Sequence, residues 1–552
     1  MALLAACGLI YEYLLAHYAG RILGSVDTTL YGMIGLMIVA MGIGAFYART
    51  ITCPYTGFAW LETGIAILGG VSVLLMAGLF SFAYILPSQL QQVYHSHETQ
   101  GIYGGGVFLF QQLAEVFPYL IGLLLGAMVG MEIPLIARIR EDIHQKHLQH
   151  NTGTIYGADY IGAGFGAAVW VVVCIKLPII VSAVATAGVN LVVGWFFLAH
   201  YFRRVKGLMF LLGVNVLIAL VLVVIAINGQ SWMSKMNNML FQDAVVFSEN
   251  TRYQNIVITQ RALKNQNKTI TRLYINGHLQ LASNDEAIYH AMLVVPPLMA
   301  SARHEKVLVI GGGDGMAVRD ILSWQPKSVT LIDLDPSMIQ LFQGAHPSAP
   351  AWLSQTLIGL NRNALNDPRV EIKYGDAFKV VETLAESGNY YDVIIVDLPD
   401  PNHPDLNKLY SDYFYGKLQQ ILAADGAISV QSTSPYFAQK AFMAVGKTMA
   451  SVGFNTRQYH TNVPSFGEWG WTIATLAGPS PAERIQRLGQ IPVKHPWLSY
   501  QQVMAAFVFS DNYFDDLESI DVNRLNSPTL YRYHAEGWQD GDGVYFSSGL
   551  DL

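Results

Sequence analysis

Cysteine is scarce in this sequence and absent from its larger part. The three cysteines, Cys7, Cys53 and Cys174, all lie in the first third of the 552-residue chain, at spacings unlike those of a metal site. The sequence has no cysteine after Cys174. We therefore expect neither a disulfide framework nor a cysteine-bound zinc, and we predict no metal centre.

Charged residues are also few, and they are unevenly distributed. They make up 13% of the chain, against 52% hydrophobic residues, and the mean hydropathy is +0.32. Residues 1–228 are a series of long apolar runs, whereas the remainder has an ordinary soluble composition and holds most of the acids. The net charge of −7 argues against nucleic acid as a partner and suits a cationic ligand.

Seven of the apolar runs approach or exceed the roughly 20 residues that cross a bilayer. The first is not a plain signal peptide, because it lacks a basic segment before it and carries Glu12 and His17. We therefore predict a multi-pass transmembrane domain over residues 1–228, in the cell membrane, with the lipid bilayer as a partner. The predicted spans are Ala2–Ile22, Leu30–Tyr47, Ala59–Ile85, Val107–Met131, Ile155–Ile175, Ile179–Ala199 and Leu208–Ile227.

Five acids fall in or beside these spans: Glu12, Glu62, Glu115, Glu132 and Asp159. Acidic side chains are costly in lipid and usually face the interior of a helix bundle. Two interpretations remain open. Either the acids form a path or site for a cation, with Glu132 and Asp159 as candidates, or they make buried hydrogen bonds that fix helix packing.

The orientation of the membrane domain is indicated in two conflicting ways. Basic residues cluster in the loops after the second, fourth and sixth spans, which the positive-inside rule makes cytoplasmic. With seven spans, the C-terminal half would then lie on the other side. A nucleotide-like ligand, for which the glycine turn described next argues, favours the cytoplasm, and we expect the catalytic domain there.

Short alternating segments replace the apolar runs after residue 228. Asn255–Gln260 and Arg272–Ile275 have the pattern of strands, and Asn276-Gly277 between strand segments is typical of a hairpin turn. A helix is predicted over Asn284–Ala300. Residues 229–300 are therefore predicted to form a small β-strand domain.

A glycine-rich turn between two apolar runs opens the next predicted domain, residues 301–495. Val307–Ile310 predicts a strand, and the turn that follows allows backbone to approach a ligand closely. Asp333 ends the second apolar run, about twenty residues past the turn, where a carboxylate can bind ribose hydroxyls. The glycines expected to form the turn are Gly311, Gly313 and Gly315.

Asp314 lies inside this turn. An acid at that point would repel a phosphate, because like charges in a small site disfavour each other. We therefore predict a ligand that is cationic near the turn.

Strands alternate with helices through residues 301–495, which predicts a Rossmann-like, methyltransferase-type α/β fold with a doubly wound, mostly parallel sheet. Ligands of such sheets bind at the carboxyl ends of the strands. Residues 496–552 are a C-terminal extension to which we assign no function. Acids at successive predicted strand ends are expected to line one pocket: Asp314, Asp333, Asp376, Asp397 and Asp400.

An acidic pocket suits decarboxylated S-adenosylmethionine, which presents a sulfonium and an ammonium and lacks the carboxylate of S-adenosylmethionine. A polyamine acceptor is also cationic. Its attacking nitrogen must lose a proton, since alkyl amines with a pKa of about 10.4 are mostly protonated at neutral pH. Asp397 is the candidate proton acceptor, and Asp400 would anchor an acceptor ammonium.

In these residues the chain resembles the spermidine synthase family, the polyamine aminopropyltransferases, over roughly Arg252 to Ala474. The membrane half is similar to that of the bacterial multi-span members. The motifs that carry the resemblance are Tyr253-Gln254-Asn255-Ile256, Asp285-Glu286 with Tyr289-His290, the glycine turn at 311–315, Asp333-Leu334-Asp335-Pro336, Gly375-Asp376-Ala377, Asp397-x-x-Asp400-Pro401 and Gln431.

The resemblance implies transfer of an aminopropyl group from decarboxylated S-adenosylmethionine, as co-substrate, to a diamine or polyamine. Methylthioadenosine is the product, no cofactor is tightly bound, and a homodimer is compatible with the family. The implied roles are methylthioadenosine contact for Gln254, ribose binding for Asp333 in place of the family's usual Glu, adenine contact for Asp376 and Ala377, aminopropyl amine binding for Asp314, polyamine contact for Tyr289, His290 and Asp400, proton acceptance for Asp397, and a covering loop that contains Pro404.

Two departures from the family pattern leave the acceptor open. Leu398 and Pro399 replace the usual small hydroxyl residues between the paired acids, and Phe466 stands where a Tyr commonly touches the acceptor. Two alternative functions also remain. One is an S-adenosylmethionine-dependent methyltransferase acting on an amine or lipid, against which Asp314 counts, and the other is a polyamine transporter or sensor.

Overall fold

The computed structural model describes residues 1–23, 26–94, 105–144, 148–239, 241, 243–263 and 268–539. The chain divides into two compact units, Met1–Gln242 and Asp243–Leu552, and each is considered by itself.

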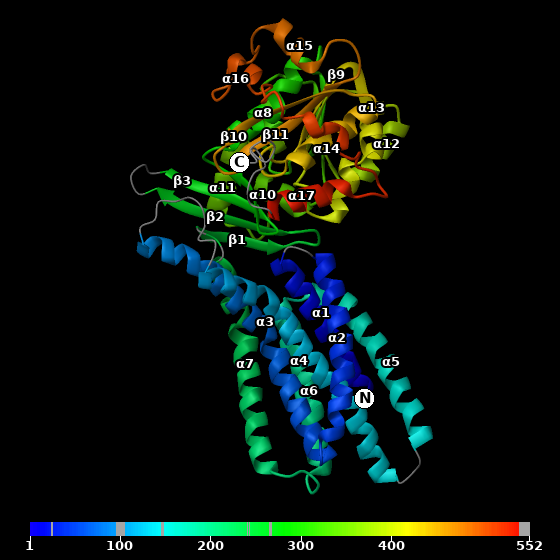
Figure 1. The fold of residues 1–552 in the computed structure, drawn as a ribbon. Coiled ribbons are helices and arrows are strands. Elements are labelled where there is room, and N and C mark those ends of the chain that lie inside the picture. The colour runs from blue at the N-terminus through cyan, green and yellow to red at the C-terminus, as the bar shows by residue number, and fades with distance from the viewer. Residues whose placement is uncertain are drawn as a thin grey trace. The chain divides into compact units, whose positions relative to one another are not determined.

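Long helices form the first unit (Figure 1). In its described part, seven are long and apolar enough to cross a membrane. Each corresponds to one of the seven predicted apolar segments, and several continue beyond the predicted ends. The helices are α1 (Ala2–Leu23), α2 (Val26–Tyr47), α3 (Pro54–Tyr94), α4 (Gly105–His144), α5 (Leu148–Val172), α6 (Ile179–Tyr201) and α7 (Leu208–Met239).

Glycines let these helices approach backbone to backbone. A Cβ added to Gly44 of α2 would lie 1.8 Å from the carbonyl oxygen of Ala127 in α4, and one added to Gly130 of α4 would lie 2.0 Å from that of Met41. Small residues at helix contacts are a common way for helices to pack this closely.

An antiparallel sheet of order β1-β2-β3-β4 begins the second unit. Its strands are β1 (Ala244–Asn250), β2 (Asn255–Leu263), β3 (Lys268–Ile275) and β4 (His278–Ala282). The predicted hairpin turn is confirmed between β3 and β4, because Asn276 and Gly277 have φ of 51° and 85°, as a primed turn requires. The helix α8 (Glu286–Ala300) follows.

The second sheet has seven strands in the order β10-β11-β9-β8-β5-β6-β7. Neighbours among β5 to β9 are parallel, which confirms the Rossmann-like expectation, and two antiparallel strands make the sheet mixed. The strands are β5 (Lys306–Gly311), β6 (Ser328–Asp333), β7 (Val370–Tyr374), β8 (Tyr391–Asp397), β9 (Leu422–Gln431), β10 (Asn455–Val463) and β11 (Gly467–Thr475).

Helices cover both faces of this sheet because its central strands are apolar on both sides. Val307 and Val309 of β5 belong to one buried cluster, and the alternate residues Leu308 and Ile310 belong to another. The first face carries α8, α9 (Met316–Leu322), α10 (Pro336–Gln343), α11 (Ala351–Asn361), α15 (Pro481–Leu488) and α16 (Tyr500–Ala505). The second carries α12 (Ala377–Glu386), α13 (Asp412–Ile421), α14 (Gln439–Ser451) and α17 (Thr529–Gln539).

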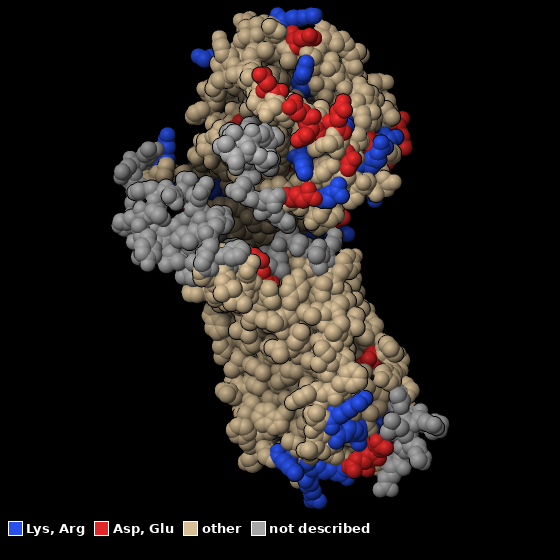
Figure 2. All heavy atoms as spheres, in the orientation of Figure 1, with Lys and Arg blue, Asp and Glu red and all other residues tan. Residues whose placement is uncertain are grey.

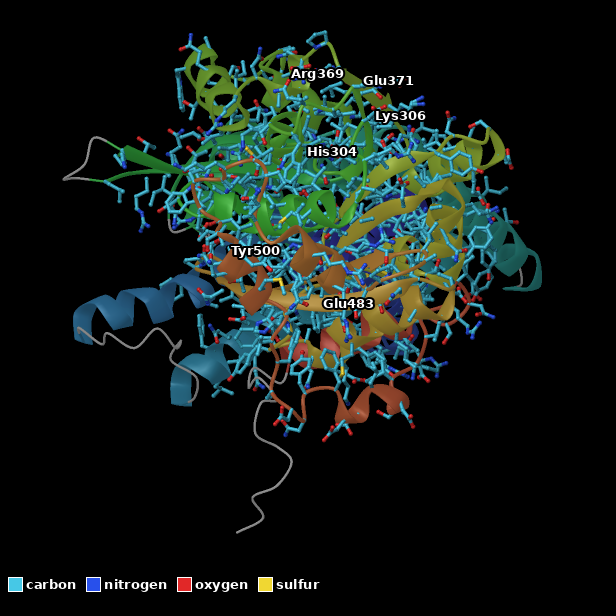
Figure 3. All side chains as sticks on the ribbon, turned by 90° about the horizontal axis from the view of Figure 1, so that it is seen from above. His304, Lys306, Arg369, Glu371, Glu483 and Tyr500 are labelled. Atoms are coloured by element: carbon cyan, nitrogen blue, oxygen red, sulfur yellow. The ribbon has the colours of Figure 1, made fainter. Side chains whose placement is uncertain are left out.

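The parallel strands all begin on one side of the sheet and finish on the opposite side. The labelled residues His304, Lys306, Arg369 and Glu371 mark the starts of β5 and β7, at one edge (Figure 3). The glycine turn and the predicted acids follow the carboxyl ends of the strands, on the opposite side, where ligands of such sheets bind.

Candidate functional site

The turn after β5 lies directly against the end of β8. Gly311 is paired with Asp397, and the Gly312 N–H donates to the Asp397 carbonyl oxygen at 3.1 Å. Gly311 has a φ of 79°, and a Cβ added there would lie 2.1 Å from that oxygen. Only glycine fits this conformation and this approach, so the turn brings the end of β5 and the Asp397 carboxylate into one site.

Asp397 has two partners from α8. The Tyr289 hydroxyl donates to Asp397 Oδ1 at 2.8 Å, and His290 Nε2 lies 4.0 Å from Asp397 Oδ2. Burial raises the pKa of Asp397, His290 opposes that rise and Asp314 adds to it, and the pKa is about 6. The carboxylate is therefore mostly ionised at neutral pH and is a stronger base than an exposed aspartate.

The His290 imidazole is held in its charged form by acids on either side. Its Nδ1 lies 3.0 Å from Glu286 Oε2. Burial alone would lower the pKa of His290, but hydrogen bonding to Glu286 and the charges of Asp314, Glu286 and Asp397 outweigh burial and raise the pKa to about 9.

Glu286 is in turn paired with a buried arginine. Arg319 of α9 donates to Glu286 Oε1 at 2.8 Å and to Oε2 at 3.1 Å, and its side chain is 9% exposed. Burial would raise the pKa of Glu286, but His290 and Arg319 lower it overall. Charges thus alternate along Arg319, Glu286, His290 and Asp397.

The other two acids near the turn are close to its glycines. Asp314 Oδ1 accepts the Met316 N–H at 2.8 Å, which fixes the start of α9. A Cβ added to Gly313 would lie 2.6 Å from Asp333 Oδ2. Burial, with help from the charges of Asp335 and Asp314, raises the pKa of Asp333 to about 7.

Asp335 links β6 to the loop before β2. Its Oδ2 accepts from Thr251 Oγ1 at 2.7 Å and from Gln254 Nε2 at 3.0 Å, and its Oδ1 accepts the Ser337 N–H at the start of α10. Gln254 is thereby fixed beside the end of β6, next to Asp333.

Asp376 begins α12 and contacts a lysine. Its Oδ1 accepts the Phe378 N–H at 3.1 Å, and its Oδ2 accepts from Lys408 Nζ at 2.6 Å. Ala377 is buried beside it. Lys408 belongs to the 3-10 helix η4 (Pro404–Tyr410), which Pro404 begins, so the predicted covering loop is tied to the predicted adenine contact.

Asp400 accepts hydrogen bonds on both oxygens. Gln431 Nε2 donates to Oδ1 at 2.6 Å, Thr433 Oγ1 donates to Oδ2 at 3.1 Å, and His534 Nε2 lies 3.2 Å from Oδ2. Thr433 has a φ of 62°, which is strained for a β-branched residue and is typical of functional sites.

Several residues of this site were not selected from the sequence. Glu286 stands in a family motif but received no role, and its spacing of four residues from the predicted site residue His290 is a signal that local analysis could have used. Arg319, Lys408, Thr433 and His534 carry no local signal, because each reaches the site through the tertiary fold. Phe466, noted for its missing hydroxyl, lies with its ring centroid 5.9 Å from that of Tyr289.

Metal binding is not indicated by the geometry. In the described part of the chain, no group of three or more His, Cys, Asp or Glu side chains is placed to hold an ion. The site is instead a set of carboxyl groups and a histidinium at the switch point between β5 and β8, an arrangement suited to cationic organic ligands.

The whole chain is also similar to known proteins. The family model described as spermine/spermidine synthase domain matches residues 286–483. The polyamine aminopropyltransferase of Shewanella oneidensis is 50% identical over 99% of this chain and 95% of its own length. Polyamine aminopropyltransferase 1 of Streptomyces coelicolor is 32% identical over 98% and 93%.

A solved spermidine synthase in complex with the transition state analogue AdoDATO covers 50% of this chain and 88% of its own, with 23% identity and a TM-score of 0.43. The family assignment rests on the full-length relatives. Since half of the residues are shared with one of them along nearly the entire sequence, the chain belongs to the polyamine aminopropyltransferase (spermidine synthase) family.

Proposed function

We propose that the chain transfers the aminopropyl group of decarboxylated S-adenosylmethionine to an amine acceptor such as putrescine and releases methylthioadenosine. The observation that supports this function best is that two acids belong to one site: Asp314 inside the glycine turn and the buried Asp397 at the end of β8. Such a site favours a donor that carries an ammonium and a sulfonium and has no carboxylate to repel.

The donor is bound along the strand ends in this proposal. Asp314 holds the aminopropyl ammonium, Asp333 the ribose hydroxyls, and Gln254 the methylthioadenosine part. Adenine lies against Asp376 and Ala377, beneath the loop that Pro404 begins. Because the Asp376 oxygens already accept from Phe378 and Lys408, an adenine amino group would share an oxygen with one of them.

The acceptor lies between α8 and Asp400. Tyr289 and His290 orient Asp397 and line the polyamine site, while Asp400 binds an acceptor ammonium. Burial, with the charge of Asp397, raises the pKa of Tyr289 far above neutral, so its hydroxyl stays protonated and donates to Asp397.

The reaction is a displacement at carbon. The acceptor nitrogen gives a proton to Asp397, and its lone pair attacks the propyl methylene beside sulfur. The new N–C bond forms as the C–S bond breaks. The electron pair of the C–S bond goes to sulfur and gives neutral methylthioadenosine. The donor is consumed as a co-substrate, so no tightly bound cofactor is needed. Positioning both reactants in line lowers the barrier together with proton removal.

We also propose that α1 to α7 span a lipid bilayer. Their outward side chains are large and apolar, as in Phe196, Met209 and Phe210, which are 74%, 82% and 71% exposed. Figure 2 shows the flank of this unit that faces the viewer almost free of charged side chains, with Lys and Arg gathered at one end. The α/β unit is placed on the cytoplasmic side in this proposal, as a nucleotide-like substrate requires.

The variant Asp397→Asn tests the assigned base. We expect kcat for methylthioadenosine release from decarboxylated S-adenosylmethionine and putrescine, followed by mass spectrometry, to fall by about 10²–10⁴-fold. Asparagine still accepts from Tyr289, but the donor KM should rise because one of the two carboxylates that attract the cationic donor is lost. Asp405→Asn, on an 89% exposed side chain of the same connection, is the matched control. Full activity of Asp397→Asn would refute the role of the base, and wild-type protein that gives no product with any of a panel of amines would refute the function.

The acid limb of the pH–rate profile tests the charge of His290. Because Asp397 must be ionised to accept a proton and its pKa is about 6, kcat/KM should fall as the pH drops through about 6. His290→Gln removes the cation that lowers the pKa of Asp397, so the limb should move to higher pH by about one to two units. His304→Gln, at the opposite edge of the sheet, should leave the limb in place (Figure 3). An unmoved limb in His290→Gln would contradict this account.

Fractionation of cells that express the full chain tests the membrane proposal. We expect the protein to sediment with membranes, to resist alkaline carbonate and to be released by detergent. Protease added to sealed inside-out vesicles should cleave the α/β unit. Release by carbonate would contradict membrane spanning, and protection of the α/β unit in these vesicles with cleavage in right-side-out ones would reverse the proposed orientation.

A further inference from the structure

The C-terminal helix α17 supplies a side chain to the acceptor end of the site. This helix lies beyond the residues that the family model matches, 286–483. Its His534 is 7% exposed, and Nε2 lies 3.2 Å from Asp400 Oδ2, although the two residues are 134 positions apart.

One side of α17 is anchored to η4 through a buried asparagine. The side chain of Asn523 is fully buried and donates to the carbonyl oxygens of Asn407 and Tyr410 at 3.1 and 3.0 Å. Its Oδ1 accepts the Leu530 N–H in the first turn of α17 at 3.2 Å. The start of the helix is thus fixed against the segment that follows Asp400.

The far end of α17 is anchored to the segment after β9. A Cβ added to Gly537 would lie 2.5 Å from the Phe437 carbonyl oxygen, and Trp538 stacks on the Phe437 ring with centroids 5.0 Å apart. His534 lies between these two anchors, so its position is set by a docked helix and not by a free tail.

The hydrogen bonds to Asp400 leave little of its carboxylate unused. A carboxylate has about four lone-pair positions. Gln431, Thr433 and His534 occupy three of them, two of the three on Oδ2. An acceptor ammonium would then meet one remaining position, whose direction depends on how the carboxylate is held.

Other ionisable groups near Asp400 come from three further elements. These are His278 of β4, Tyr410 of η4 and Tyr289 of α8. Desolvation lowers the pKa of His278, with Asp400 opposing and His534 adding to that effect.

We propose that His534 is a positioning residue for the acceptor: by donating Nε2–H to Asp400, it aims the free lone pair of that carboxylate at the distal ammonium of a diamine or polyamine. The inference rests on the proposed function. It makes the C-terminal extension part of the acceptor subsite and assigns that extension a role in amine affinity, while the donor half of the site stays independent of it.

Steady-state kinetics of His534→Ala and His534→Gln test this role. The putrescine KM of His534→Ala should rise about 3- to 10-fold, which is what loss of one hydrogen bond gives. The donor KM and kcat should stay within twofold of the wild-type values. His534→Gln, whose amide can donate to Asp400, should recover most of the affinity. Arg532→Ala, on a 58% exposed side chain of the same helix, is the control.

Three results would overturn the inference: an unchanged putrescine KM, a lowered one, which would mean that a histidinium competes with the substrate, or an equal rise in the donor KM. Wild-type protein that releases no methylthioadenosine would instead contradict the proposed function. Calorimetric binding of putrescine to wild type and His534→Ala would still test the positioning role in that case.

Discussion

The site depends on keeping the buried carboxylate of Asp397 ionised. A carboxylate whose side chain is 10% exposed would take up a proton near neutral pH unless a cation faced it. His290 is that cation, and it stays charged because Glu286 lies against its other nitrogen and Arg319 in turn keeps Glu286 ionised. Each member of this chain of charges would be costly alone, so the ionised state of Asp397 depends on the whole row.

The fold places this row beside the glycine turn. β5 and β8 are neighbours at the point where the strand order reverses, so the glycine turn and Asp397 meet without any loop having to reach across. The α8 helix packs on one face of the sheet and presents Tyr289 and His290 to that meeting point. In the proposed function, Asp314 makes a loop that commonly holds phosphate one wall of a cation site.

Much of the fold and the positions of the site's acids could be predicted from local sequence patterns. The partners of those acids could not. Apolar runs, glycines and acids at strand ends are properties of short segments, which is why the helices, the parallel sheet and the acid-bearing edge could be predicted. The partners that set the charge of Asp397 and hold Asp400 lie far along the chain: Arg319 is 33 residues from Glu286, and His534 is 134 from Asp400. Such contacts exist only after the sheet and its covering helices have formed. The assigned roles of the individual side chains stay predictions.

Calorimetric titration of the purified full-length protein with decarboxylated S-adenosylmethionine and, separately, with S-adenosylmethionine tests the central claim most directly. The two ligands differ by one carboxylate, which would face Asp314 and the other acids of the site. The account predicts that the decarboxylated form binds at least about tenfold more tightly, since one unfavourable charge contact of about 1.4 kcal/mol is a tenfold change in affinity. Equal affinity, or tighter binding of S-adenosylmethionine, would contradict a cation site built around the glycine turn.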